Sequence, residues 1–186
     1  MAHKDNVTFS DVIRLVNKSL TDFYSYDSIL LDYETEDIAV AERCMVFRIG
    51  WYMLNRMQRN KKFHWADLDC EYNRNFRDPK YIYVEDHTGN NTKKKNVVPD
   101  LLIHKRRSNE NNLLVIEFKK GEPEQNDRNN DIRKLTFFTD SSSEYSYSYG
   151  LYIELHKNSA IVQVYQEGEH CAYLDYQWQK KNPEPK

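Results

Sequence analysis

The chain has 186 residues, a formal net charge of −2, 30% charged residues and 39% hydrophobic residues. This length predicts one domain over residues 1–186, and the balanced charge argues against a protein that is basic over its whole surface. No apolar run approaches a membrane span, and residues 1–6 lack a secretory signal, so we expect a cytoplasmic, non-membrane protein.

The first part of the chain predicts two helices. Thr8 or Ser10 can cap a helix over about 8–24, which has an apolar stripe with helical spacing. A longer helix is expected over about 34–57, and Glu42 lies within its apolar stripe. Glu42 is either the edge of that face or a carboxylate directed into a functional site.

Strands are expected next, over 67–74, 81–85, 97–104 and 113–120. The polar segment 105–112 favours a hairpin between the last two, and 86–96 reads as an exposed loop. A helix over about 127–138, a strand over 149–155 and an antiparallel ribbon over about 160–176 follow. Helix, three strands, helix and strand in that order predict an α/β (α+β) fold, with a central mixed sheet flanked by helices and a core over about 34–155.

The cysteines Cys44, Cys70 and Cys171 are far apart, without CxxC or zinc-site spacing. Each lies among apolar residues, so we expect reduced cysteines in the core of a protein from a reducing compartment.

Three charged residues lie at the ends of two apolar runs, 97–104 and 113–120. Glu117 and Lys119 project on the same side of their strand, because strand side chains alternate. A carboxylate and an ammonium at the end of a buried strand are costly unless paired or bound to a metal. If the runs form a hairpin, Asp100 can join them and complete a divalent-cation site.

Context makes this pattern more specific. Acid-x-lysine occurs at 78–80, 117–119 and 184–186, but only 117–119 follows an apolar run. Pro99-Asp100 is the only Pro-Asp pair in the chain.

Pro99-Asp100 together with Glu117-Phe118-Lys119 resembles the PD-(D/E)xK nuclease superfamily, which has the restriction-endonuclease-like fold. Segments 68–74 and 112–115 also resemble small uncharacterised bacterial and phage members. The resemblance covers about 34–155 and implies an αβββαβ core and a nuclease that hydrolyses DNA or RNA phosphodiester bonds. Glu42 resembles the extra acid that many members contribute from the first core helix.

The chemistry of these residues is compatible with that activity. Asp100 and Glu117, with Glu42 and the Phe118 carbonyl, would hold Mg²⁺ (or Mn²⁺), which prefers a few hard oxygen ligands. Lys119 would orient or deprotonate water or stabilise the transition state, and its pKa would have to fall for it to act as a base.

Basic residues surround the motif. From 93 to 120 there are eight basic and three acidic residues, which indicates solvated loops or a phosphate-contacting rim. Asp131 and Lys134 lie one helical turn apart, as in an ordinary surface ion pair, although Lys134 could instead point at the cleft. The expected substrate contacts are Lys93, Lys94, Lys95, Lys105, Arg106, Arg107, Lys120, Arg74, Asn73 and Lys134.

Two further interpretations remain open. A non-catalytic nucleic-acid- or protein-binding module could retain the fold, and a phage-defence or counter-defence role would rest on analogy alone. A lysine-dependent enzyme acting on carbonyl compounds lacks any accompanying cofactor motif. Many nucleases of this fold dimerise, so a homodimer is compatible with the sequence.

Overall fold

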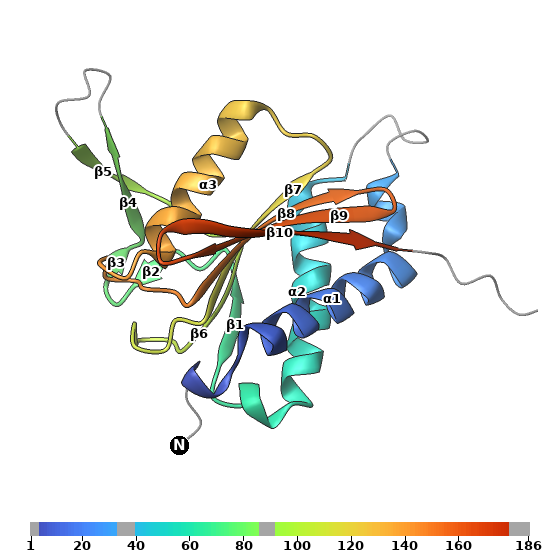
Figure 1. Ribbon diagram of the computed structural model, residues 1–186, viewed down its shortest axis with the longest axis horizontal. Coiled ribbons are helices and arrows are strands. Elements are labelled where there is room, and N and C mark those ends of the chain that lie inside the picture. Colours follow the sequence, from blue (N-terminus) through green and yellow to red (C-terminus); the bar gives the residue numbers. More distant parts are fainter. Residues whose placement is uncertain (1–3, 33–39, 86–91, 179–186) are drawn as a thin grey trace, which may run out of the picture.

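The computed structural model describes residues 4–32, 40–85 and 92–178. Its centre is a mixed six-stranded sheet with the strand order β1-β6-β7-β8-β9-β10 (Figure 1). The sheet strands are β1 (Asp67–Cys70), β6 (Leu101–His104), β7 (Leu114–Lys120), β8 (Tyr149–His156), β9 (Ser159–Gln166) and β10 (Glu169–Gln177). The helices are α1 (Phe9–Tyr26), α2 (Glu42–Gln58) and α3 (Gln125–Thr139), with short 3-10 helices η1 (Lys4–Asn6), η2 (Ser28–Leu31) and η3 (Lys61–Phe63). The expected mixed α/β class is therefore confirmed.

The predicted hairpin forms the middle of the sheet. β6 and β7 pair antiparallel, with Leu101 opposite Ile116 and Leu102 opposite Val115. β8 then lies parallel to β7, and α3 connects the two strands. The ribbon of β9 and β10 completes one side of the sheet, as expected for the end of the chain.

The helices cover opposite faces of this sheet, with α3 on one face and α1 and α2 on the other (Figure 1). Alternation along β7 assigns its side chains to these faces: Ile116 and Phe118 pack in the cluster with α1 and α2, and Val115 packs in the cluster with α3. By the same alternation, Glu117 and Lys119 lie on the α3 face.

α2 approaches the sheet closely at Gly50. A Cβ there would lie 3.0 Å from Leu101 Cδ1 and 3.2 Å from Cys70 Sγ, so a larger residue would push α2 away from the sheet. This approach holds the middle of α2 against the end of β1 and the start of β6.

Several predicted boundaries were wrong. α2 begins at Glu42 after an extended Ala41 (φ −62°, ψ 138°), and 34–39 lies outside the described residues. β1 ends at Cys70, because Glu71 adopts a left-handed φ of +48°. The predicted strand over 97–104 forms only from Leu101, consistent with the missing N–H of Pro99.

Two small two-stranded sheets account for other differences between the structure and the sequence prediction. β2 (Arg74–Asn75) pairs with β3 (Asp78–Pro79), and β4 (Tyr81–Glu85) pairs with β5 (Thr92–Asn96). Residues 92–96 are therefore a strand and not a loop, while 86–91 lies outside the described part of the chain.

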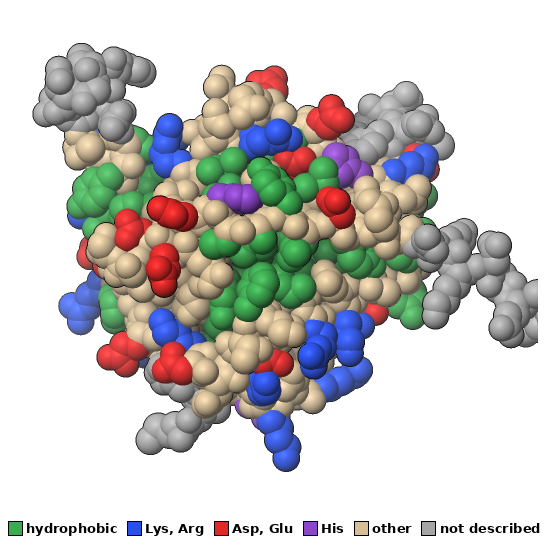
Figure 2. Space-filling model, in the orientation of Figure 1, with side chains coloured by type: hydrophobic (Ala, Val, Ile, Leu, Met, Phe, Trp, Pro, Cys, Tyr) green, Lys and Arg blue, Asp and Glu red, His purple; other side chains and the backbone are tan. Residues whose placement is uncertain are grey.

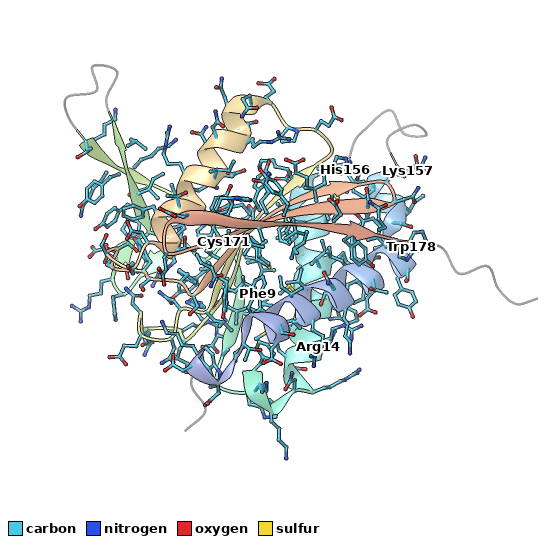
Figure 3. The ribbon with its side chains drawn as sticks, viewed as in Figure 1. Phe9, Arg14, His156, Lys157, Cys171 and Trp178 are labelled. Atoms are coloured by element: carbon cyan, nitrogen blue, oxygen red, sulfur yellow. The ribbon has the colours of Figure 1, made fainter. Side chains whose placement is uncertain are left out.

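The cysteines are free, but the expectation that they lie in the core was wrong, because all three are exposed. Cys70 ends the edge strand β1, and Cys171 lies on β10, at the other edge of the sheet. Figure 3 shows Cys171 and Trp178 toward opposite ends of β10. Edge strands leave side chains accessible that would be covered in a central strand.

On the face shown in Figure 2, basic and acidic side chains are interspersed around a band of hydrophobic side chains. Within residues 4–32, 40–85 and 92–178, no helix has both the length and the apolar character needed to cross a membrane.

Candidate active site

The first carboxylate of the site, Asp100, lies immediately before β6. The Phe118 N–H on β7 donates to Asp100 Oδ2 over 2.7 Å, so the hairpin register fixes the carboxylate beside the end of β7. Burial raises the pKa of Asp100 to about 6, although this hydrogen bond and the charges of Lys134 and Lys119 favour its ionised form.

The second carboxylate, Glu117, is completely buried. Lys134 Nζ on α3 lies 2.7 Å from its Oε2, whereas its Oε1 has no hydrogen-bond partner among the described residues. Burial and the neighbouring charge of Asp100 raise the pKa of Glu117 well above its ordinary value, against the opposing effect of Lys134. The Asp100 carboxylate is therefore close enough to disfavour ionisation of Glu117.

A third carboxylate comes from α3. Asp131 is 5% exposed, and its Oδ1 lies 2.7 Å from Lys134 Nζ. Its Oδ2 lies 2.9 Å from Lys119 Nζ. The pair one helical turn apart is thus buried against β7, and the interpretation as an ordinary surface ion pair was wrong.

Glu42 approaches Lys119 from α2. Its Oε1 lies 3.4 Å from Lys119 Nζ, and its Oε2 accepts a hydrogen bond from the Lys120 N–H over 3.0 Å. Burial opposes the charge of Lys119, but Asp131 and Glu42 together raise its pKa above the ordinary value. Lys119 therefore joins the carboxylates of both helices, and its ammonium is held in the charged form.

The carboxylates fit a hard cation only in part. Among the described residues, no group of three or more His, Cys, Asp or Glu side chains is arranged to hold a metal ion. The charge of Asp100 nevertheless acts on Glu117, and Glu117 Oε1 is buried without a hydrogen-bond partner among the described residues. Mg²⁺ commonly binds one or two protein carboxylates and keeps several waters, so this pair meets its minimum requirement. The carboxylate of Glu42 instead contacts the Lys119 ammonium and the Lys120 N–H.

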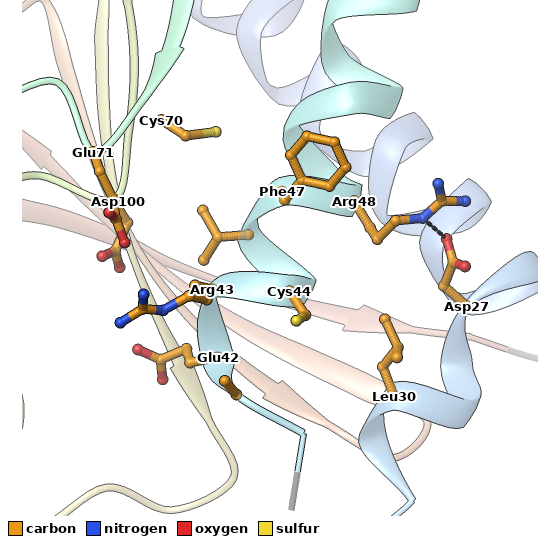
Figure 4. Close-up of a pocket in the computed structure, with 12 residues that line it drawn as sticks. Asp27, Leu30, Glu42, Arg43, Cys44, Phe47, Arg48, Cys70, Glu71 and Asp100 are labelled. Atoms are coloured by element: carbon orange, nitrogen blue, oxygen red, sulfur yellow. Dashed lines mark hydrogen bonds and ion pairs between the residues drawn. The ribbon is translucent and has the colours of Figure 1, made fainter.

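The carboxylates of Glu42, Asp100, Glu117 and Asp131 are called the acidic group below. A pocket of about 780 Å³ opens beside this acidic group (Figure 4). Glu42, Glu71 and Asp100 line one end, and Asp27 and Arg48 line the other. A ligand in the pocket would therefore lie directly against two of the predicted site residues.

Some predicted substrate contacts lie near the site. Lys95 on β5 lines a smaller hollow of about 220 Å³ together with Asp131 and Lys134. Lys93 and Lys94 are exposed on the same strand. The Lys120 backbone binds Glu42, and its Nζ lies 3.3 Å from the Val40 carbonyl oxygen.

Other predicted contacts lie elsewhere. Lys105, Arg106 and Arg107 follow β6, at the end of the hairpin remote from Asp100. Arg106 Nε donates to Asp69 Oδ2 over 2.8 Å, and Lys105 Nζ lies 3.5 Å from an oxygen of Asp67. The structure does not bring this basic turn to the acidic group.

Asn73 and Arg74 are exposed near β2, and neither lines the 780 Å³ pocket. The Asn73 carbonyl accepts a hydrogen bond from the Lys80 N–H. These residues have no contact with the acidic group in the described structure.

The sequence interpretation assigned neither Asp131, which it read as part of a surface ion pair, nor Arg43 to the candidate site. Arg43 lines the pocket next to Glu42. A signal for Asp131 was present, since Asp131, Lys134, Leu135 and Phe138 share one face of a helix, and Leu135 and Phe138 are core residues.

No protein-family model, curated protein or solved structure matches this chain.

Proposed function

We propose that this protein is a metal-dependent nuclease that hydrolyses DNA or RNA phosphodiester bonds in an active site formed by Asp100, Glu117 and Lys119. The observation that carries the proposal is the proximity of two carboxylates with raised pKa values, the half-buried Asp100 and the fully buried Glu117, beside a charged lysine. Ionising both carboxylates of such a pair is unfavourable without a metal, and a bound divalent cation offsets this cost. Groups with perturbed pKa values of this kind concentrate at functional sites.

Asp100 and Glu117 would hold Mg²⁺ or Mn²⁺. When bound, the ion would supply a water of lowered pKa and would stabilise negative charge on the phosphoryl oxygens. Glu42 and Asp131 hold the Lys119 ammonium in place and charged. Lys119 is therefore suited to orient water and neutralise developing charge, more than to remove a proton.

The arrangement of elements also supports a restriction-endonuclease-like core. Along the chain, α2, β1, β6, β7, α3 and β8 follow one another, with the two small sheets inserted between β1 and β6. We interpret this succession as the αβββαβ order of the superfamily that the motif resembles. Asp100 and Glu117 occupy the central hairpin, and Glu42 lies on the helix before it.

Cleavage assays test the proposal. Labelled single- and double-stranded DNA and RNA are incubated with the protein in Mg²⁺, Mn²⁺ or EDTA. We expect cleavage only with a divalent metal, and a rate lower by roughly 10²–10⁴-fold in Asp100→Asn and Lys119→Met. Lys105→Met, at the other end of the hairpin, is the matched control. Absence of metal-dependent cleavage, or parental rates in both site variants, would refute the proposal.

A non-catalytic binding module is the second candidate. It is favoured by one observation: Lys134 and Lys119 already neutralise Glu117 and Asp131 without a metal. In that case the lysines and carboxylates would be a buried ion-pair network that fixes α3 on the sheet. Calorimetric titration with Mn²⁺ separates the candidates, because the network alone requires no cation.

A further inference from the structure

The 780 Å³ pocket beside the acidic group has the size and position of a ligand site. Small-molecule sites are typically about 300–1,000 Å³ and mostly apolar, with a few polar groups that fix orientation. Between its charged ends this pocket is lined by apolar or weakly polar side chains, which are Leu30, Ala41, Cys44, Val46, Phe47 and Cys70. This volume is large enough for a nucleotide, and the mostly apolar wall suits a nucleobase.

An aromatic ring is available on the pocket wall. Phe47 lies on α2 beyond Arg43, and it is 61% exposed although it lines the pocket. An exposed aromatic ring offers a face on which a nucleobase can stack, a contact that tolerates any base. Bases in a duplex are already paired and stacked, so only an unpaired base can use it.

A cationic group stands between this ring and the acidic group. Figure 4 shows Arg43 beside Glu42, directed toward the end of the pocket with Asp100. No carboxylate among the described residues lies within ion-pair distance of Arg43. A guanidinium without a carboxylate partner among the described residues suits a backbone phosphate, which it can bind in a bidentate manner.

The opposite end of the pocket carries a fixed polar pair. Arg48 Nε donates to Asp27 Oδ2 over 2.8 Å, and the Tyr52 hydroxyl donates to the same oxygen over 2.6 Å. These contacts hold a donor-bearing and an acceptor-bearing side chain in one place. They provide hydrogen-bonding groups for the edge of a base inserted into the pocket.

We propose that this pocket receives one unpaired nucleobase next to the reacting phosphate, with Phe47 as the stacking surface and Arg43 as the phosphate contact. The inference rests on the proposed nuclease function and assigns its substrate class as single-stranded, flapped or bulged nucleic acid. Fully paired duplex would leave the pocket empty.

Binding in EDTA tests the pocket without requiring cleavage. Fluorescence anisotropy is measured for fluorescein-labelled single-stranded DNA, single-stranded RNA and blunt duplex DNA. We expect tighter binding of at least one single strand than of the duplex. Phe47→Ala should weaken single-strand binding by about 5- to 150-fold, the range for loss of one stacked base. Phe47→Tyr, which keeps the ring, should bind like the parent.

Tyr173→Ala is the matched control, because Tyr173 is similarly exposed, at 66%, but lies on β10 away from the pocket. It should leave binding unchanged. Arg43→Gln should weaken single-strand binding and reduce its salt dependence. Thermal unfolding of each variant checks that the fold is retained, which is expected since both aromatic side chains are exposed.

The inference is overturned if Phe47→Ala and Arg43→Gln bind single strands like the parent, if duplex binds as tightly as single strands, or if neither single strand binds. Its outcome is separable from that of the nuclease proposal. Parental binding in Phe47→Ala with normal metal-dependent cleavage refutes only the base pocket. Phe47-dependent binding without cleavage in any metal supports the pocket and refutes catalysis.

Discussion

The two ends of the β6–β7 hairpin both bring acids and bases together, with opposite electrostatic results. At one end, Asp69 on β1 is partly buried, but Arg106 and His104 hold its pKa well below the ordinary value. At the other end, burial raises the pKa of Asp100 to about 6 and that of Glu117 well above normal. Charges are satisfied at the first end and left in excess at the second.

We interpret this difference as one between a structural ion pair and the proposed metal site. Asp69 is matched by a bidentate guanidinium and by the His104 ring, 3.0 Å from its Oδ2. Glu117 is more deeply buried, yet one of its oxygens has no partner among the described residues. Retaining a buried, incompletely paired acid costs stability, which is typical of sites that bind a charged ligand.

The largest expected difference between the two ends is in catalysis. Glu117→Gln removes one of the two carboxylates proposed to bind the metal, so we expect the rate of metal-dependent cleavage to fall by roughly 10²–10⁴-fold. Arg106→Ala breaks the matched pair at the other end and should change the rate by less than about threefold, since it lies outside the site. Single-turnover cleavage rates of the two variants are compared. Equal losses in both would remove the functional distinction between the ends.

The next difference is in the cost of removing a lysine. Lys134→Met leaves Glu117 and Asp131 buried without their shared ammonium, so the free energy of unfolding should fall by about 3–5 kcal/mol. Lys105→Met removes an exposed partner of Asp67 and should cost at most about 1 kcal/mol. Urea unfolding at pH 8 measures both. A loss below about 1 kcal/mol for Lys134→Met would show that the acidic group does not depend on it.

The smallest difference between the two ends is in the sign of the effect that removing a carboxylate has on the free energy of unfolding, measured in EDTA. The pKa of Asp100 rises from about 4 in the unfolded chain to about 6 on folding. Folding therefore takes up a proton between these values, and the free energy of unfolding falls as pH rises through them, by up to about 3 kcal/mol. Asp100→Asn removes this loss and should stabilise the protein at pH 7.5.

Asp69→Asn should do the opposite. The pKa of Asp69 is lowered on folding, so its contribution is present above about pH 4 and is lost as pH falls. We expect Asp69→Asn to destabilise the protein by about 1–3 kcal/mol at pH 7.5. Urea unfolding of both variants between pH 4 and 8 checks the signs. The same sign for both would contradict the contrast between the two ends.

Much of the hairpin could be predicted from sequence, because it depends on local patterns. Apolar runs and a polar turn are enough to pair Leu101 with Ile116, and this pairing places Asp100 beside Glu117. Strand alternation also puts Glu117 and Lys119 on one face. These features extend over about 20 residues and require no knowledge of the distant chain.

The contributions of the helices could not be predicted in the same way. Asp131 and Lys134 reach Glu117 and Lys119 only because α3 packs on the face of β7 to which those side chains point. Glu42 reaches Lys119 because α2 begins there, and not earlier as its apolar spacing indicated. Such contacts depend on tertiary packing, which a local pattern does not specify.

Mn²⁺ binding followed by isothermal titration calorimetry, at pH 7.5 and pH 5, tests the central claim most directly. We predict one ion bound with release of protons at pH 7.5, weaker binding at pH 5 because Asp100 is then protonated, and loss of binding in Glu117→Gln. Asp69→Asn should bind Mn²⁺ like the parent. Absence of binding at pH 7.5, or unchanged binding in Glu117→Gln, would contradict a metal site at the Asp100–Glu117 pair.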